Sequence, residues 1–260
     1  MAQEAAGTLG FGKYFSDHMF LMDYDPENGW HDARIEPYHP LTLDPASVVL
    51  HYGQEIFEGM KAYRSKDDEI LFFRARKNAE RWNQSAERMC MPTMDPDMYL
   101  EALNAIVNVE RDWVPHAYGT SLVLRPAMIA VDPFLGVHPS SRYLFFILCA
   151  PSGAYFKNGM NPVNIYVEEE YIRAAPGGTG FAKCGGNYAG SLLAAAKAEA
   201  KGYEQVLWLD AKEHKYVEEV GGMNMMFVID DTIITAPLDG TILPGVTRDS
   251  ILTLARDAGY

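Results

Sequence analysis

The stretch of residues 177–188, GGTGFAKCGGNY, places a single lysine, Lys183, between two pairs of glycines. Small residues on both sides let the backbone bend and approach a bound group closely. An amine held in such a tight, partly dry place loses its proton more readily and becomes a nucleophile. The stretch therefore has two interpretations, a lysine that forms a Schiff base with a carbonyl compound or a purely structural glycine loop.

Two nucleotide-binding interpretations of these glycines fail. A P-loop requires Gly-Lys-Ser or Gly-Lys-Thr, whereas this chain has Ala182, Lys183 and Cys184 in that order. In addition, no G-x-G-x-x-G pattern follows an expected strand here.

The composition is typical of a globular protein, with a large excess of acidic over basic residues. The chain has 260 residues, 48% of them hydrophobic, and a formal net charge of −13. Such a charge repels polyphosphate, so nucleic acid and anionic membranes are not expected partners. The sequence shows neither a signal peptide nor a long apolar run, which predicts a cytoplasmic protein. Three cysteines and seven scattered histidines indicate neither a disulfide framework nor a metal site.

In the first 150 residues, the pattern predicts strands and two helices. Residues 1–47 are interpreted as a surface arm with short strands, and residues 48–50, 57–63 and 69–73 as strands, the last two forming a hairpin. Apolar residues at helical spacing predict helices over 74–89 and from Pro96 to about 109, the latter burying Tyr99, Ala102, Leu103, Ile106 and Val109. Further strands are expected at 120–131 and 143–149, and the Gly- and Pro-rich residues 151–162 suggest a domain boundary.

Beyond the lysine stretch, a helix is expected over 191–201, entered directly from the lysine loop. Strands at 205–210, 215–220, 223–229 and 232–236 predict a mainly antiparallel sheet. The turn at Pro244 and Gly245 precedes a final helix that reaches Ala258. Backbone amides at that helix start would bind a phosphate, although Thr247 taken by itself is better interpreted as a simple N-cap.

These segments together resemble the branched-chain amino acid aminotransferases, class IV aminotransferases of the pyridoxal-phosphate fold type IV group. The resemblance runs from about residue 48 onward through HYGQEIFEGMKAY, GTSLVLRP, PSGAYFKNG, FAKCGGNYAGSLL, EQVLWLD, VEEVGGMN and LPGVTRDS. It implies a mixed α/β (α+β) fold with an N-terminal α/β domain over 1–150, an interdomain loop over 151–162 and a domain over 163–260 that carries the lysine.

The resemblance also implies pyridoxal 5'-phosphate as cofactor and transfer of an amino group between Leu, Ile or Val and 2-oxoglutarate. In that case Lys183 forms the Schiff base, Glu219 contacts the pyridine nitrogen and Tyr188 lies near the phenolic oxygen. The phosphate is held by Arg81 with Val246 and Thr247. From its helix alone, Arg81 reads as a surface arginine.

The substrate pocket implied by the family has apolar and charged parts. Its implied members are Tyr52, Phe57 and Val137 on the apolar wall, Arg125 near the glutamate carboxylate, Gly222 and Met223 along the site, and Tyr155 in a covering loop. Phe57 and Val137 also fit plain core positions, and Arg125 fits a surface charge at a strand end. Family members are usually homodimers.

Two departures qualify this expectation. Several relatives have an aromatic residue where this chain has Val123, and the family's chains usually continue past Tyr260. The second domain therefore reads as incomplete, and weak or absent turnover is expected from this chain. A D-amino acid aminotransferase, an aminodeoxychorismate lyase and a non-catalytic binding protein or fragment remain as alternatives.

Overall fold

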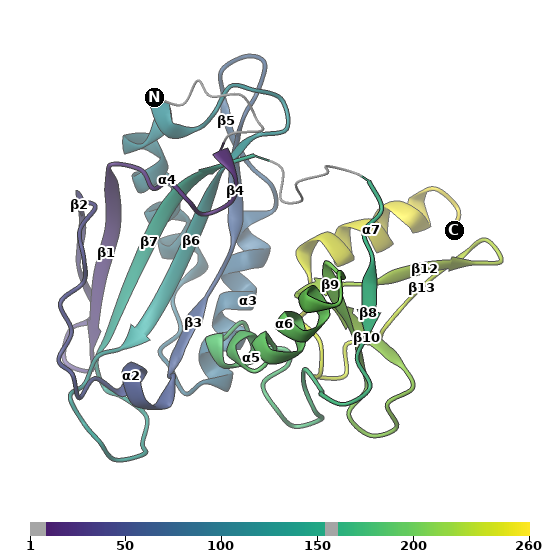
Figure 1. Cartoon of the computed structure of the whole chain (residues 1–260). Helices are drawn as coiled ribbons and strands as arrows, with labels where there is room; N and C mark the ends of the chain where they lie inside the picture. The colour runs from purple at the N-terminus through teal and green to yellow at the C-terminus, as the bar shows by residue number, and fades with distance from the viewer. Residues whose placement is uncertain (1–8, 154–160) are drawn as a thin grey trace. The chain divides into compact units, whose positions relative to one another are not determined.

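The computed structural model describes residues 9–153 and 161–260, and it contains two compact units, Met1–Met160 and Asn161–Tyr260 (Figure 1). Each unit has its own sheet and its own buried side chains. Within these described residues, no helix has both the length and the apolar character required to cross a membrane.

The first unit is built on a seven-stranded sheet in which every described pairing is antiparallel. Its order is β2-β1-β7-β6-β4-β5, with β3 also paired to β6. The predicted strands at 120–131 and 143–149 are confirmed as the long central pair, and the predicted hairpin is β4 with β5. The strands are β1 (His18–Asp25), β2 (Gly29–Pro37), β3 (Glu55–Phe57), β4 (Met60–Arg64), β5 (Ile70–Phe72), β6 (Ser121–Ala130) and β7 (Tyr143–Ser152).

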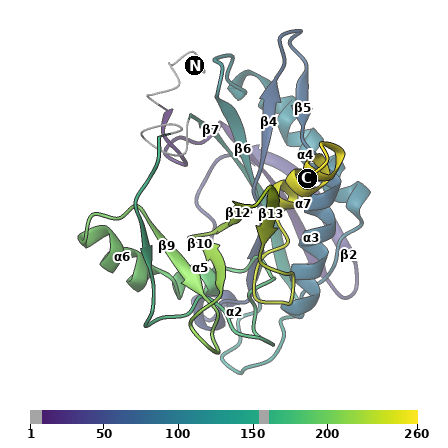
Figure 2. The ribbon, with the colours of Figure 1, turned by 90° about the vertical axis from the view of Figure 1, so that its right-hand side faces the viewer.

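Two helices, α3 (Ala75–Arg88) and α4 (Pro96–Val109), pack together against one face of this sheet (Figures 1 and 2). Their contact is aromatic, since the Trp82 ring lies 5.5 Å from that of Tyr99 and 5.3 Å from that of Phe145 on β7. Both helices were expected from the apolar spacing, and both are confirmed. The expectation fails at Val109, which is 52% exposed because it lies at the last position of α4.

Three expectations for this unit are wrong. Residues 1–47 are more than a surface arm, because β1 is paired on both sides, by β2 and β7, and buries Met19 through Met22, as a strand covered on both faces does. The run from Val48 is the short helix α2 (Val48–Tyr52), because three apolar residues fit either structure and the left-handed Gly53, with φ of 60°, ends the turn. The strand expected at 57–63 is broken after Phe57, at Glu58 and Gly59.

The second unit contains a four-stranded sheet in the order β11-β10-β9-β8 and a separate two-stranded ribbon. β8 and β9 are parallel and the other pairs are antiparallel. A parallel pair requires a crossover, which here contains the lysine stretch and two helices. The elements are β8 (Ile165–Val167), α5 (Gly185–Ala189), α6 (Leu192–Ala200), β9 (Gln205–Leu209), β10 (Val217–Val220), β11 (Met223–Asn224), β12 (Met226–Ile229), β13 (Thr232–Thr235) and α7 (Val246–Asp257).

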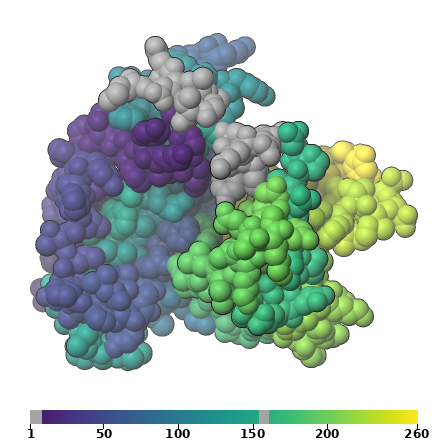
Figure 3. Space-filling model, in the orientation of Figure 1, coloured from purple at the N-terminus to yellow at the C-terminus, as the bar shows by residue number. Residues whose placement is uncertain are grey.

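The core of this unit lies between α6 and the sheet. Ala194 and Ala198 on α6 pack with Val206 and Trp208 on β9, and Tyr166, Tyr171 and Tyr203 surround them. The opposite side of α6 is exposed at Leu192 and Leu193, and α6 lies on the face turned to the viewer in the space-filling view (Figure 3).

Here too the sequence was partly misleading. The strand expected at 223–229 is split into β11 and β12, and β8 was missed because it has only three residues. The lysine loop does not enter the helix at 191–201 directly, since α5 intervenes. Thr247 is not an N-cap, because the extended residue before α7 is Gly245.

Candidate functional site

The loop that carries Lys183 is closed by one side chain, Asn187. Its amide nitrogen donates to the carbonyl oxygens of Thr179 and Ala182, both at 2.8 Å, and its amide oxygen accepts from the Thr179 hydroxyl at 2.7 Å. Both N–H groups and the carbonyl oxygen of the Asn187 side chain are thereby used within the loop. Gly177, with a left-handed φ of 78°, supplies a bend that favours glycine, and Asn187 fixes the loop.

The Lys183 amine lies next to a phenol. Its Nζ is 2.7 Å from the Tyr188 hydroxyl, within hydrogen-bond distance, and 5.2 Å from the centre of the ring. Tyr188 belongs to α5, which begins two residues after Lys183. The short helix thus turns the phenol back toward the amine.

Glu219 on β10 is a buried carboxylate with three partners. Its side chain is only 2% exposed and forms an ion pair with Arg173, Nε to Oε2, at 2.9 Å. Its Oε1 accepts from Asn224 Nδ2 at 2.9 Å and from the Leu243 backbone N–H at 3.2 Å. Burial raises the pKa of Glu219 above its usual value, while Arg173, the Leu243 N–H and Lys183 act in the opposite direction.

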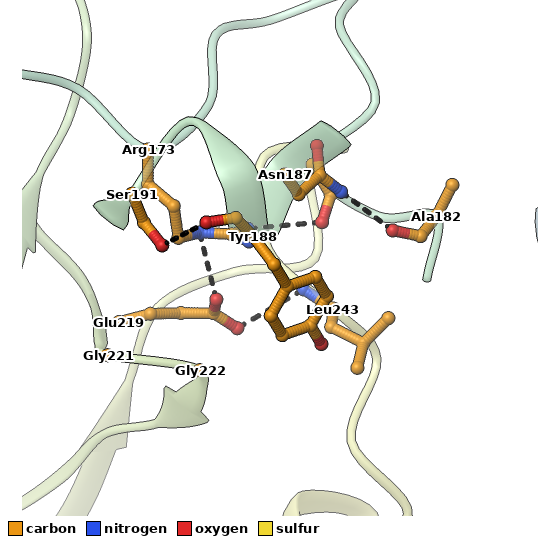
Figure 4. A pocket seen from close by; sticks show the side chains of 10 residues that line it. Arg173, Ala182, Asn187, Tyr188, Ser191, Glu219, Gly221, Gly222 and Leu243 are labelled. Carbon is orange, nitrogen blue, oxygen red and sulfur yellow. Dashed lines mark hydrogen bonds and ion pairs between the residues drawn. The ribbon is translucent and has the colours of Figure 1, made fainter. Parts of the chain in front are cut away.

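A cavity in the second unit joins these groups (Figure 4). Tyr188 and Glu219 both line it, and the Lys183 amine, which is not part of the lining, contacts the hydroxyl of Tyr188. The glycine pair Gly221 and Gly222 lines the same cavity, and a Cβ at Gly222 would lie 3.7 Å from the Tyr188 ring. The full lining consists of Arg173, Gly180, Ala182, Asn187, Tyr188, Ser191, Glu219, Gly221, Gly222 and Leu243.

The turn before α7 is fixed to the same site by Asn224. Its Nδ2 bridges Glu219 and the Leu243 carbonyl oxygen, at 2.9 and 3.0 Å, and a Cβ at Gly245 would lie 2.1 Å from its Oδ1. Gly245 is therefore required for this close approach. Val246 and Thr247 follow it in the first turn of α7, and backbone N–H groups at a helix start are suited to bind an anion.

In the first unit, Arg81 is buried, and the interpretation of it as a surface arginine is wrong. Its side chain is 9% exposed and that of Glu58 is 0% exposed. The guanidinium donates to both Glu58 oxygens, Nε to Oε1 at 2.7 Å and Nη2 to Oε2 at 2.9 Å, and Asn78 Nδ2 also donates to Oε2 at 2.9 Å. A helix pattern gives no sign of this pair, because Glu58 comes from the break between β3 and β4.

Of the pocket residues expected in the first unit, Arg125 and Phe57 are neighbours. The Arg125 guanidinium lies 4.9 Å from the centre of the Phe57 ring, and the Tyr52 hydroxyl donates to the carbonyl oxygen of Leu135. Arg125 lies inside β6 and Val137 is 85% exposed, so a strand-end position for the first and a core position for the second are both wrong. In the second unit Gly222 lines the cavity, while Met223 is 38% exposed. Tyr155 lies outside the described residues.

The sequence reasoning missed three polar residues that hold the site together, Arg173, Asn187 and Asn224. Two of them stand close to glycine pairs, in GGNY and GGMN. An amide next to a glycine pair is a usable signal, since its side chain can bond to backbone that lacks side-chain cover. Arg173 has no such signal, because Glu219 and Thr241 are distant from it in sequence.

Comparisons with known proteins agree with this arrangement. The family model described as "Amino-transferase class IV" matches residues 55–260. The branched-chain-amino-acid transaminase 1 of Bacillus subtilis (strain 168) is 56% identical over 253 residues, which cover 97% of this chain and 71% of that protein. The branched-chain-amino-acid aminotransferase of Mycolicibacterium smegmatis is 52% identical over 256 residues, 96% of this chain and 70% of that protein.

Solved structures of branched-chain amino acid aminotransferases have a similar fold. The branched-chain amino acid aminotransferase from Escherichia coli superimposes with a TM-score of 0.73 at 28% identity, covering 94% of this chain and 74% of that one. Another branched-chain amino acid aminotransferase, solved with pyridoxamine 5'-phosphate, gives 0.74 at 27% identity, covering 94% and 75%. With the family model spanning most of its length and relatives above 50% identity, this chain belongs to the class IV aminotransferases, among the relatives of the branched-chain-amino-acid aminotransferases.

Proposed function

We propose that this chain is a pyridoxal-phosphate-dependent transaminase that moves an amino group between L-leucine, L-isoleucine or L-valine and 2-oxoglutarate. The names of its relatives support the reaction and the substrate class. The observation that carries the proposal is the cavity lined by Tyr188 and Glu219, with the Lys183 amine 2.7 Å from the Tyr188 hydroxyl.

The residues present fit the cofactor. Pyridoxal phosphate offers an aldehyde, a phenolic oxygen, a ring nitrogen and a phosphate, and the site offers an amine, a phenol, a carboxylate and a helix start. The Glu219 Oε2 that pairs with Arg173 has a second lone pair, so it can also accept a bond from a protonated ring nitrogen. Gly222 lines the cavity without a side chain, which leaves space beside the Tyr188 ring.

When bound, pyridoxal phosphate supplies a carbonyl group for amines and a ring that withdraws electrons from the substrate Cα. Lys183 would hold the cofactor through its Nζ and, once released by the substrate amine, would move the Cα proton as a general base. Glu219 would keep a proton on the ring nitrogen by charge attraction. Tyr188 would donate to the phenolic oxygen, and Arg81 with the N–H groups of Val246 and Thr247 would hold the phosphate.

For the substrate side chain, we propose the set implied by the family resemblance. Tyr52, Phe57 and Val137 would supply apolar surface, and Arg125 would attract the second carboxylate of glutamate. The cation–π arrangement of Arg125 over Phe57 supports a shared role, because it places charge beside apolar surface. Gly222, Met223 and Tyr155 complete the proposed set. A branched-chain amino acid aminotransferase of similar fold was solved with N-(5'-phosphopyridoxyl)-L-glutamate, which supports glutamate as the second amino donor.

The wider assignments rest on the family resemblance and on composition. We propose a homodimer that acts in the cytoplasm in branched-chain amino acid biosynthesis, with glutamate as the amino donor in that direction. We also propose the domain division at residues 151–162, which is supported by the two compact units.

The test is covalent trapping followed by a donor panel. The protein is incubated with pyridoxal phosphate, reduced with borohydride and digested, and the modified peptide is identified by mass spectrometry. We expect modification at Lys183 and none there in Lys183→Ala, whereas Lys215→Ala serves as a control that leaves it unchanged. The absorbance of the bound cofactor should then change with L-leucine, L-isoleucine and L-valine.

Two results would contradict the proposal. A cofactor attached elsewhere, or not at all, would remove Lys183 from its role. A faster spectral change with D-alanine than with L-leucine would favour a D-amino acid aminotransferase. This readout follows a single half-reaction, so it does not depend on sustained turnover.

A further inference from the structure

We propose that Arg173 is a positioning residue that keeps the Glu219 carboxylate ionised and directed into the cavity. Arg173 belongs to the segment between β8 and the lysine loop. It is not among the residues that the family resemblance implies. The proposal deepens the proposed function, on which it rests for the role of Glu219.

The Arg173 guanidinium connects separate parts of the second unit. Its Nε lies 2.9 Å from Glu219 Oε2, and its Nη2 donates to the carbonyl oxygens of Gly180, at 3.0 Å, and Thr241. Gly180 belongs to the lysine loop and Thr241 to the segment that leads to α7. One side chain therefore joins β10, the lysine loop and the segment that leads to α7, and Figure 4 shows its ion pair with Glu219.

The Arg173 guanidinium is buried within the site. Its side chain is 8% exposed and the carboxylate of Glu219 is 2% exposed, so water screens neither charge. The planar fork of arginine suits the task, because it reaches a carboxylate and two carbonyl oxygens at once. A lysine at this position would reach fewer of them.

Electrostatics explain why Glu219 requires this partner. The charged groups near its carboxylate are Arg173, Glu218 on the same strand and Lys183 in the neighbouring loop. Burial raises the pKa of Glu219 most strongly, Glu218 raises it further, and Arg173 is the strongest opposing group. Lys183 contributes less, and as the proposed general base it would give up and take up a proton during the reaction, whereas an arginine stays charged. Arg173 therefore supplies the positive charge that persists through the reaction.

The consequence concerns the ring nitrogen of the cofactor. A charged carboxylate attracts a proton to that nitrogen, whereas a neutral carboxylic acid does not. Without Arg173, buried Glu219 would take up a proton itself at higher pH. The electron-withdrawing form of the ring would then be lost although Glu219, Lys183 and Tyr188 are all present.

The test measures the charge of Glu219 in protein free of cofactor. Glutamate side-chain carboxyl carbons are labelled with ¹³C, the Glu219 resonance is assigned with Glu219→Gln, and its chemical shift is followed against pH by NMR. We expect Glu219 to be ionised at pH 7 in the natural chain. In Arg173→Met the proton affinity of Glu219 should rise tenfold or more, an increase of about 1 or more in its pKa. Arg173→Lys should restore part of this difference.

Arg248→Met is the matched control. Arg248 lies in the same unit and donates to a loop carbonyl, that of Ala236, at 2.9 Å. We expect its replacement to leave the Glu219 titration unchanged. A Glu219 that is already protonated at pH 7 in the natural chain would overturn the proposal, even if Arg173→Met fails to fold. An unchanged titration in Arg173→Met would overturn it as well.

A second measurement separates this proposal from the function on which it rests. With pyridoxal phosphate bound, Arg173→Met should shift the pH at which the absorption band of the cofactor changes, and Arg248→Met should not. If the natural chain binds no cofactor, the proposed function fails, while the NMR titration still decides whether Arg173 controls Glu219. If the cofactor binds but the Glu219 titration is unchanged in Arg173→Met, only the present proposal fails.

Discussion

Arg81 and Glu58 form a buried, bidentate ion pair, and the two charges depend on each other. Removing one partner leaves the other charge buried without compensation, which typically costs about 3–5 kcal/mol. We therefore predict that Arg81→Met lowers the free energy of unfolding by roughly that amount. Chemical denaturation followed by circular dichroism measures it.

The double variant Arg81→Met with Glu58→Gln tests whether Arg81 also serves the cofactor. We expect it to regain most of the lost stability, because no buried charge remains unpaired. Its affinity for pyridoxal phosphate should nevertheless stay weak, since the proposed phosphate ligand is gone. Recovered stability together with unchanged cofactor affinity would contradict the phosphate role of Arg81 and leave it a structural residue.

At the scale of single residues, the sequence indicated candidate reactive side chains, but it did not indicate the residues that hold them in place. Glycines on both sides of Lys183 made it a candidate, the family resemblance selected the Schiff-base interpretation, and that role stays a prediction. Arg173 was not a candidate, since its partners Gly180, Glu219 and Thr241 are separated from it by loops of irregular conformation. Periodicity describes one element at a time, and these contacts are made between elements.

The connection between β6 and β7 is organised by Asp132. One carboxylate oxygen accepts from the Ser141 N–H at 2.6 Å and the Ser141 hydroxyl at 2.8 Å, and the other accepts from Arg142 Nε at 2.8 Å. Burial alone would raise the pKa of Asp132, but bonds from Arg142, Ser141 and Ser140 hold it well below the ordinary 3.8. Its carboxylate thus stabilises the fold when it is ionised.

We predict that Asp132→Asn lowers the free energy of unfolding by about 1–3 kcal/mol at neutral pH. Because the pKa in the folded state is depressed, the contribution of Asp132 is present above the unfolded value and is lost as pH falls below it. The difference between natural chain and variant should therefore shrink below about pH 4. Urea denaturation at several pH values measures this. A comparable loss from Asp44→Asn, whose carboxylate accepts only the Ala46 N–H among the described contacts, would argue against a special role for Asp132.

At the scale of elements, length decided what could be predicted. The helices α3 and α4 and the strands β6 and β7 are long enough for several apolar repeats, and all four were found from the sequence. The short run at Val48 was assigned to a strand but is a helix, since three consecutive apolar residues fit a buried strand and a helix equally well. β8 was overlooked for the same reason, although it fixes the parallel crossover that carries Lys183.

Each of the two compact units has a core that contains a buried tryptophan. Trp82 is 1% exposed and packs against Tyr99 and Phe145 in the first unit, and Trp208 is 1% exposed and packs beneath α6 in the second. Truncating a buried tryptophan to alanine typically costs about 3–5 kcal/mol, through lost contacts and the cavity that remains. A unit with its own core can open on its own, so this cost should be felt locally.

We therefore predict that Trp82→Ala speeds hydrogen exchange mainly in β6 and β7, and that Trp208→Ala speeds it mainly in β8, β9 and β10. Native-state hydrogen exchange with mass spectrometry resolves both sets of strands. Trp113→Ala, at a partly exposed position of the first unit, should change exchange less than Trp82→Ala. Equal acceleration in both sets from either core substitution would mean that the chain opens as one cooperative body, and the proposed division at residues 151–162 would then have no energetic meaning. Faster exchange confined to the substituted unit would mean that each core stabilises its own unit. The stability of the site around Lys183 would then depend on the core beneath α6.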